Sequence, residues 1–593
     1  MAKQIVTIRS QPGIKRDGTK FEGDQYVDGQ WVRFQRGLPR KIGGYRSINK
    51  YIEGLPRAIH EYTQDSLTYL HLGSAGSVER LYIDGSFNTS VVTDRTPTSG
   101  FTVNAENLWQ FAAAYDTTDG NQIVGQVAPN LNCICNSLGG ELFTGDLLGT
   151  GVLTAVPALN KPANFNSAGG VVSLAPYTFV FGNDGYVAWS VPNAPDDYVG
   201  SGAGNAFVTS QKIVKGMTLR GGPGNSPSGL FWSADSLIRV NFIGGTAVFQ
   251  FDTISTQTSI LSANCVIEYD GIFYWIGTDR FLMFNGVVRE IPNNLNLNFF
   301  FDNLNDAQRQ KVFAVKVPRY GEIWWCFPKG TSDEPNHAVI YNVRENTWYD
   351  TPLPNGGRGA GAFPIVFNRP VMTGIDPQNF IATAVSINTA STGYVVGNTL
   401  TVVGGTGPID AELTVSTVNG SGGVTGVSIS NVGLYTSVPA NPVAVTGGAG
   451  TGARFNITFV RPYKLWVHEA GTNEIDGTDL QPILSFFETG DLSLPTVGSE
   501  NRALQVLMIE PDFVQSGDMT LQVVGRANAR AAEVAGPIMT FPAVASTPQE
   551  QVVFLKEQRR ELRFRFSSNT LGGDYQMGQV LAHVQPGDGT TLG

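Results

Sequence analysis

The sequence predicts an all-β protein whose body is a β-propeller of about six to eight blades. The first observation is a repeated unit: a glycine, an aromatic-rich run, and a tryptophan four residues after the glycine. It occurs in residues 184–189, 270–275 and 320–325, and residues 229–232 form a shorter relative. Glycine accepts the positive φ of tight hairpin turns, and aromatic residues favour a pleated, half-buried surface. The intervals between units correspond to one or two blades of roughly 40–50 residues.

The second observation is composition. Of the 593 residues only 15% are charged, 41% are hydrophobic, and 70 are glycine. Low charge with abundant glycine is typical of short strands joined by tight turns. Helices would carry more glutamate, lysine and arginine on their surfaces.

Residues 1–50 are basic and irregular, which predicts an N-terminal arm. Residues 31–34 could form a strand, and residues 39–45 a turn. Two interpretations stay open. The basic groups are either solvated or docked on an acidic neighbouring subunit.

Residues 51–379 are expected to form the first part of the propeller. Residues 67–83 alternate as a hairpin, whereas the weak pattern of residues 136–176 predicts a long loop. One short helix is expected at 304–312, capped by Asn303 or Asn305. It leads into a complete four-stranded blade.

The composition changes near residue 380. Residues 380–460 contain almost no charge and alternate as β-strands, which predicts a small inserted Gly-rich β module at an exposed loop. Residues 461–593 are expected to hold the last part of the propeller and a C-terminal tail. In that part residues 562–566 place arginines on one face and apolar residues on the other.

Charge and hydropathy exclude several functions. The net charge of −10 argues against gripping nucleic acid through its phosphates, although DNA could still slide past the protein. No run of 18 apolar residues suggests a membrane helix, and residues 1–10 lack the apolar segment of a secretion signal.

No residue pattern predicts catalysis, a cofactor or a metal. There is no phosphate-binding glycine loop followed by Lys-Ser/Thr, no His-Glu-x-x-His and no nucleophile elbow. Asp184, Asp270 and Asp279 suit turns better than the paired carboxylates of a glycosidase. Residues 116–121 suit a polar turn better than a calcium loop. We therefore expect no enzyme, no catalytic residue, no cofactor and no metal ligand.

The five histidines are scattered, and lone histidines are usually structural: His60, His71, His337, His468 and His583. Four cysteines in so long a chain do not form a disulfide framework. Cys265 and Cys326 lie in apolar strand sequence and are expected in the core. Cys133 and Cys135 are either half of a metal site or small buried residues.

Four stretches resemble one family. They are residues 12–19 with 31–45, residues 320–325 with 341–348, residues 465–473, and residues 563–566 with 572–578 and 586–589. In these stretches the chain resembles the tail nozzle proteins of short-tailed bacteriophages, also called packaged-DNA stabilization proteins. Residues 380–460 separately resemble a Gly-rich β module of phage tail and fibre proteins, which the plain nozzle pattern lacks.

The resemblance implies a structural virion protein with a propeller body. It would form a homohexameric ring, the nozzle at the distal end of the viral tail, which retains packaged DNA and serves as its exit channel during ejection. The implied partners are other copies of the chain, the adaptor ring that links the tail to the portal, and tail fibres, spikes or a needle. DNA would pass without sequence-specific binding. Assembly would occur in the host cytoplasm, with no stable membrane insertion.

Two hypotheses about function follow. The first is this conduit, whose lumen should be acidic or neutral so that DNA does not adhere. Residues 136–176 or 194–228 are candidates for a loop that gates it. The alternative is a carbohydrate-binding or glycan-degrading propeller involved in host-surface recognition. It would need two pocket carboxylates about 5–9 Å apart beneath an exposed tryptophan.

Overall fold

The computed structural model describes the chain in ten ranges: residues 4–20, 24–52, 54–64, 67–101, 108–117, 131–136, 141–219, 227–493, 503–527 and 530–587. Residues 49–50, 64 and 131–136 are described by their backbone alone. The chain divides into two compact units. Unit 1 comprises residues 1–49, 56–373 and 466–593, and unit 2 comprises residues 50–55 and 374–465.

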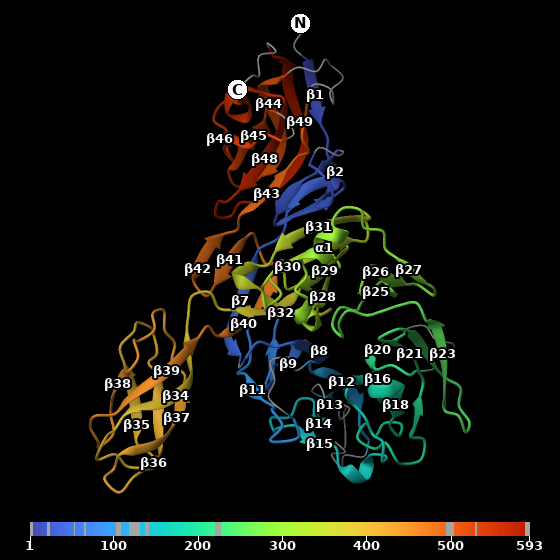
Figure 1. Cartoon of the computed structure of the whole chain (residues 1–593), viewed down its shortest axis with the longest axis vertical. Helices are drawn as coiled ribbons and strands as arrows, with labels where there is room; N and C mark the ends of the chain where they lie inside the picture. The colour runs from blue at the N-terminus through green and yellow to red at the C-terminus, as the bar shows by residue number, and fades with distance from the viewer. Residues whose placement is uncertain are drawn as a thin grey trace. The chain divides into compact units, whose positions relative to one another are not determined.

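Six sheets of unit 1 each contain four antiparallel strands, and they follow one another along the chain (Figure 1). In chain order they are β8 Ala58–Gln64, β9 Leu67–Gly73, β10 Val78–Ile83 and β11 Thr93–Asp94; β12 Gln110–Tyr115, β13 Leu131–Asn136, β14 Leu142–Asp146 and β15 Thr154–Ala155; β16 Gly170–Leu174, β17 Tyr177–Phe181, β18 Tyr186–Trp189 and β19 Gly204–Phe207; β20 Ile213–Thr218, β21 Ser228–Ser233, β22 Leu237–Phe242 and β23 Phe249–Ser255; β24 Ile267–Tyr269, β25 Ile272–Ile276, β26 Phe281–Phe284 and β27 Val288–Glu290; and β28 Phe313–Val317, β29 Glu322–Phe327, β30 His337–Asn342 and β31 Thr347–Pro352.

A seventh blade combines distant parts of the sequence. Its strands β32 Arg358–Ala362, β33 Val371–Ile375, β40 Tyr463–His468 and β7 Tyr45–Ile52 are neighbours in one sheet. This sheet is extended by the hairpin of β41 Asn473–Asp476 and β42 Asp479–Pro482. The N-terminal part of the chain therefore completes a blade whose other strands come from the middle of the sequence.

The seven blades close into a ring. Their first strands are in contact in the order β20, β16, β12, β8, β32, β28 and β24. The remaining gap, between the blades that begin with β20 and β24, is bridged by Trp232 and Trp275, whose ring centroids lie 5.7 Å apart. The prediction of an all-β propeller is confirmed, with seven blades in the described residues.

The repeated unit marks hairpin turns, as predicted. Gly185, Gly271 and Gly321 have φ of 67°, 78° and 73°, and the aspartates before the first two also have positive φ. The tryptophans that follow are buried. The unit does not hold one fixed place in a blade, however. It opens the second strand at β25 and β29 but the third at β18.

The two ends of the chain share a β-sandwich within unit 1 (Figure 1). One sheet has the order β47-β44-β49-β6-β5 with β1 also paired to β49, and the other has the order β4-β43-β48-β45-β46. A common apolar core lies between them, from Val506 and Val580 in one sheet to Leu521 and Phe564 in the other. The strands are β1 Gln4–Ile8, β4 Asp28–Gln30, β5 Val32–Gln35, β6 Leu38–Lys41, β43 Ser485–Glu488, β44 Leu504–Gln515, β45 Met519–Arg526, β46 Val534–Phe541, β47 Val553–Arg559, β48 Glu561–Ser568 and β49 Tyr575–Pro586, with the parallel pair β2 Gln11–Ile14 and β3 Gln25–Tyr26 beside them.

This arrangement differs from the expected division of the chain. From residues 461–593 only β40 supplies one of the four blade strands; β41 and β42 extend that sheet, and β43 to β49 build the sandwich. The N-terminal arm is not a loose extension, because β1, β4, β5 and β6 are strands of the same two sheets. Alternating strands look alike in a sequence whether they belong to a blade or to a sandwich.

Unit 2 has its own core. Its six-stranded sheet has the order β34-β39-β38-β35-β36-β37 and surrounds buried residues such as Leu400, Leu413 and Phe455. The strands are β34 Ile381–Thr389, β35 Thr399–Val403, β36 Glu412–Val418, β37 Val424–Asn431, β38 Val443–Thr446 and β39 Arg454–Val460. These strands fall within the range expected for the inserted module, which the sequence places between β33 and β40.

One local expectation was correct only in part, and another was wrong. A helix does occupy most of the expected range, because residues 306–311 form a 3₁₀ helix that follows Asn305. The α-helix α1, however, spans Leu297–Asn303 and begins about two turns earlier than expected. The Asn303 amide donates to the Phe299 carbonyl at 2.8 Å and closes a helix end instead of opening one. Residues 141–176 contain β14, β15 and β16. Buried and exposed residues do not alternate regularly along these strands, so the sequence pattern did not indicate them.

Candidate functional site

The residues that carry the family resemblance gather at one place in unit 1. Strand β5 of the sandwich, Ile42 directly after β6, strand β29 of the sixth blade and Trp466 of β40 share a single hydrophobic core. Trp31, Trp324 and Trp466 are all buried in it. We call this region the junction, because it joins the sandwich to the propeller.

Arg33 is the centre of the junction. Its Nε lies 2.9 Å from Glu322 Oε1, and its Nη2 donates to Glu322 Oε2 at 3.1 Å. On its other side Nη1 and Nη2 donate to the two carboxylate oxygens of Glu469, at 3.1 and 2.5 Å. The Arg33 and Glu322 side chains are 1% and 0% exposed. A single guanidinium thus connects the sandwich, the sixth blade and the segment after β40.

The neighbours of this ion pair complete its bonding. Glu322 also accepts hydrogen bonds from Trp324 Nε1 at 2.9 Å and from Tyr349 Oη at 2.6 Å. The Tyr320 ring lies 3.7 Å from the Arg33 guanidinium carbon. Buried charges are tolerated when they are paired and hydrogen-bonded. Arg33 is paired with two carboxylates, although its Nε makes only the ion-pair contact with Glu322 and no hydrogen bond of good geometry.

Burial and pairing act in opposite directions on these groups. Burial opposes the charge on Arg33, but Glu322 and Glu469 more than offset it and raise the arginine's pKa. Burial raises the pKa of Glu322, although Arg33 opposes the shift. Burial, followed by the charge of Glu322, raises the pKa of Tyr349 well above its usual value. The pair is stable as ions only while both partners are present.

The backbone is fitted closely around the junction. Trp31 has a φ of 53°, its N–H donates to Thr351 Oγ1 at 2.9 Å, and its indole donates to the Gly43 carbonyl at 3.1 Å. A Cβ on Gly43 would lie only 2.5 Å from Glu469 Oε2. Glycine is therefore required where the chain passes this carboxylate.

A second ion pair fixes the arm to the sixth blade. Arg16 donates to both carboxylate oxygens of Asp350, at 2.8 and 3.1 Å, and His337 Nε2 lies 2.8 Å from Asp350 Oδ2. Burial raises the pKa of Asp350, but Arg16 and His337 outweigh it and hold the value at about 2. Lys41 likewise donates to the Gly573 carbonyl at 2.8 Å. These three basic side chains of the arm, Arg16, Arg33 and Lys41, therefore bind partners within the same chain, and are neither solvated nor docked on another subunit.

The C-terminal alternation is confirmed in part. Leu562, Phe564 and Phe566 are buried in the sandwich core. Arg563 lies on the opposite face, as expected, but it is only 3% exposed and pairs with Glu488 at 2.7 Å and Asp491 at 3.3 Å. The sequence contained a signal for such pairs, because a charge inside an aromatic strand, as at Arg33 or Glu322, needs a buried partner.

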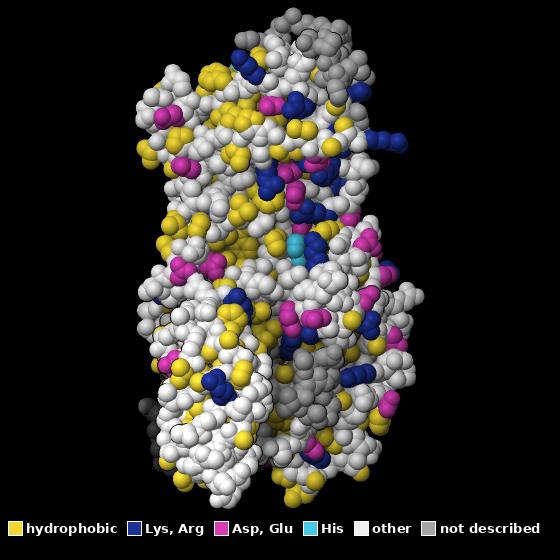
Figure 2. Space-filling view, turned by 60° about the vertical axis from the view of Figure 1, so that its left-hand side comes forward, with side chains coloured by type: hydrophobic (Ala, Val, Ile, Leu, Met, Phe, Trp, Pro, Cys, Tyr) yellow, Lys and Arg dark blue, Asp and Glu magenta, His cyan; other side chains and the backbone are white. Residues whose placement is uncertain are grey.

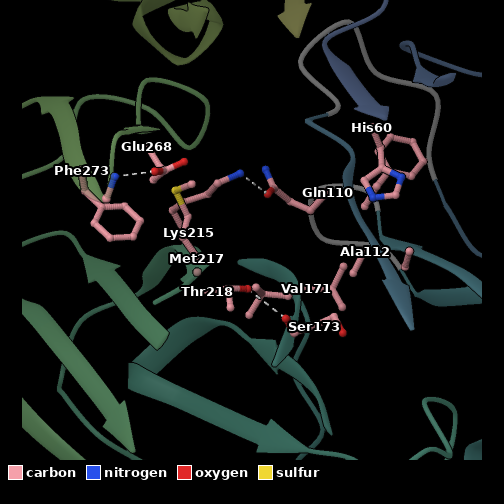
Figure 3. A pocket seen from close by; sticks show the side chains of 15 residues that line it. His60, Gln110, Ala112, Val171, Ser173, Lys215, Met217, Thr218, Glu268 and Phe273 are labelled. Atoms are coloured by element: carbon pink, nitrogen blue, oxygen red, sulfur yellow. Dashed lines mark hydrogen bonds between the residues drawn. The ribbon is translucent and has the colours of Figure 1, made fainter. Parts of the chain in front are cut away.

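The junction offers no reactive group to a substrate, since Arg33 and Glu322 are closed to solvent. A cavity of about 410 Å³ lies elsewhere in unit 1, where the first strands of several blades face one another. Figure 3 shows Lys215 of β20 reaching across it to Gln110 of β12, with His60 of β8 and Glu268 of β24 on its walls. We call it the axial cavity.

The other candidate residues are dispersed. Cys265 and Cys326 are buried, as expected, and Asp184 and Asp270 occupy turns with positive φ. His71 and His468 are buried in different blades, and His583 lies 2.7 Å from Glu510. The side chains of Cys133 and Cys135, and residues 118–121, fall outside the described residues. Within the described ranges, no three His, Cys, Asp or Glu residues are grouped to hold a metal ion, and no helix is long and apolar enough to cross a membrane.

No family model matches this chain. No curated protein matches it either. Among solved structures it is similar to YCF48 bound to D1 peptide, with 10% identity over 61% of this chain and 94% of that chain and a TM-score of 0.30. It is also similar to a Bacteroides fragilis protein described as exported, with 10% identity over 46% of this chain and 86% of that one and a TM-score of 0.25. At these values neither likeness bears on function.

Proposed function

We propose that this protein is a structural subunit of a short-tailed bacteriophage tail. In this proposal it forms the distal nozzle ring, which retains packaged DNA and serves as its exit channel. The observation that carries the proposal is the junction. Four segments that resemble nozzle proteins pack around Arg33 and its neighbours: residues 31–45, 320–325, 465–473 and 572–578. A tube subunit under load needs such a rigid connection between its parts.

The edges of the sandwich suit lateral contacts in a ring. β46 and β47 are the outermost strands of their sheets. Ile538 on β46 and Phe554 on β47 are 66% and 69% exposed. Open edge strands with exposed apolar side chains favour pairing with another chain. Cyclic assembly through one repeated contact would cover them.

Charge is compatible with a DNA conduit. The chain carries a net charge of −10. On the face in Figure 2, lysine and arginine side chains lie among aspartate and glutamate and do not gather into one basic patch. A channel lined by a surface of this kind would let DNA pass without adhering.

The carbohydrate-active alternative requires two acids in one pocket, and the cavities found among the described residues do not supply them. Four cavities lined by described residues contain at most one carboxylate each: Glu268 in the axial cavity, Glu141 in another, and none in the other two. We therefore do not favour a hydrolase.

Native mass spectrometry of the purified protein tests the proposal. We expect a species containing six copies of the 63.7 kDa chain. The double substitution Ile538→Asp/Phe554→Asp should shift it to monomers. Val287→Asp, at a propeller residue that is 58% exposed, should leave the hexamer intact. A wild-type protein that stays monomeric at micromolar concentration, with no ring in images of virion tails, would contradict the proposal.

A further inference from the structure

The axial cavity contains a half-buried cation, Lys215, that is not paired with a carboxylate of the described residues. Lys215 Nζ donates to Gln110 Oε1 at 3.1 Å, and no carboxylate among the described residues forms an ion pair with it. Glu268, on the same cavity, is bonded elsewhere. Its Oε1 accepts from the Gly271 N–H at 2.7 Å, and its Oε2 lies 3.3 Å from Lys316 Nζ. Burial lowers the pKa of Lys215 to about 8, so most of the lysine is charged at pH 7.

Gln110 has a donor without a partner in the same place. The side chain is 5% exposed, and its Nε2 makes no hydrogen bond. Since an ammonium group can only donate, Lys215 fixes the amide with its oxygen toward the lysine and its NH₂ away from it. His60, also on the wall, has an unpartnered Nδ1, and burial together with Lys215 lowers its pKa to about 4, so the ring is neutral at pH 7.

An unpaired donor in a buried site normally costs stability, and an unpaired charge costs more. Water could satisfy the amide, but it would bring no charge to balance the lysine. The cavity is large enough for a small molecule, and apolar side chains such as Val171, Met217 and Phe273 form the rest of its wall. Thr218 and Gly271, which also line it, are exposed, so the cavity reaches the surface.

We propose that the axial cavity is a binding site for a small anion, whose carboxylate or phosphate oxygens accept hydrogen bonds from Lys215 and Gln110. Two adjoining cavities, of about 450 and 240 Å³, also have Gln110 in their walls. Gln110 therefore lies on the walls of all three cavities, where it can bind a ligand that enters any of them. The inference does not depend on the tail function.

Isothermal titration calorimetry of the full chain at pH 7 tests the site, with succinate and inorganic phosphate as separate probes. We expect saturable binding of at least one probe. Lys215→Met should weaken it by about tenfold or more, the effect of losing one charged hydrogen bond. Lys212→Met is the matched control. It removes the same charge three positions earlier, just before β20 begins, from a residue that lines only the adjoining cavity, and this variant should bind like the wild type.

Gln110→Glu keeps the shape of the side chain and supplies an internal carboxylate for Lys215. We expect this variant to lose anion binding and to unfold at a higher temperature than the wild type without added anion. Binding of succinate alone would identify a carboxylate ligand, and binding of phosphate alone a phosphate ligand. The proposal is overturned if neither probe binds, or if Lys215→Met and Gln110→Glu bind both probes as the wild type does.

Discussion

Removing Arg33 should weaken the junction more than any exposed ion pair in the molecule could. In Arg33→Met, two carboxylates that shared one guanidinium lose it, and Glu322 is 0% exposed. Breaking a buried pair on one side costs about 3–5 kcal/mol, because the remaining charge stays uncompensated. Glu322 keeps its hydrogen bonds from Trp324 and Tyr349, and Glu469, with 12% exposure, can turn toward water. We therefore expect the free energy of unfolding to fall by about 3 kcal/mol.

Urea unfolding followed by tryptophan fluorescence measures this loss. Trp31 and Trp324 are buried with ring centroids 6.1 Å apart, so their emission reports on the junction. With a slope of about 3 kcal/mol/M, the midpoint should fall by about 1 M. Arg280→Met removes an exposed pair with Asp279, at 48% and 59% exposure, and should change stability by less than about 1 kcal/mol.

Two further measurements separate lost charge from lost packing. Adding Glu322→Gln to Arg33→Met should recover much of the stability, since it removes the orphaned charge. Burial raises the pKa of Glu322 in the folded state, so protonation favours folding. The single variant should regain stability as the pH falls and lose it as the pH rises. An Arg33→Met protein as stable as the wild type, or a double variant no better than the single one, would refute this reasoning.

Three other predictions concern the rest of the chain. Because the pKa of Asp350 lies at about 2, below its ordinary 3.8, its ionised form stabilises the fold above that value. Asp350→Asn should cost about 2 kcal/mol at pH 7, and the gap to the wild type should close between about pH 4 and 2 in acid unfolding; a constant gap would contradict this. Gly271→Ala, with open space around its Cβ, should lower the free energy of unfolding by about 1 kcal/mol. Gly185→Ala, whose Cβ meets the Thr209 backbone, should lower it by about 3 kcal/mol. Thermal melts measure both losses, and equal losses would contradict the prediction. A fragment of residues 374–465 should fold alone by circular dichroism, because Asp376 N–H donates to the Pro462 carbonyl at 2.8 Å and joins its ends; a disordered fragment would show that its core is insufficient.

Local patterns were enough to predict the all-β class, the propeller and the inserted module. Turns with positive φ favour glycine, asparagine and aspartate, and strands alternate every second residue. The structure around Gly271 and around Leu400 could therefore be predicted from the residues nearby in the sequence. The same locality explains two errors. Asn303 is a possible cap at either end of a helix, and the partly buried strand β16 has no clear alternation.

What the sequence by itself determined is therefore the kind of element at most positions and the near absence of long helices. Only the tertiary structure decided which strands share a sheet: that β7 completes the seventh blade, that the two ends of the chain form one sandwich, and that Arg33 meets Glu322 and Glu469. The physical reason is that pairing between residues hundreds of positions apart depends on chain closure and on burial in a common core. Neither chain closure nor burial in a common core can be recognised from the residues that are adjacent in the sequence.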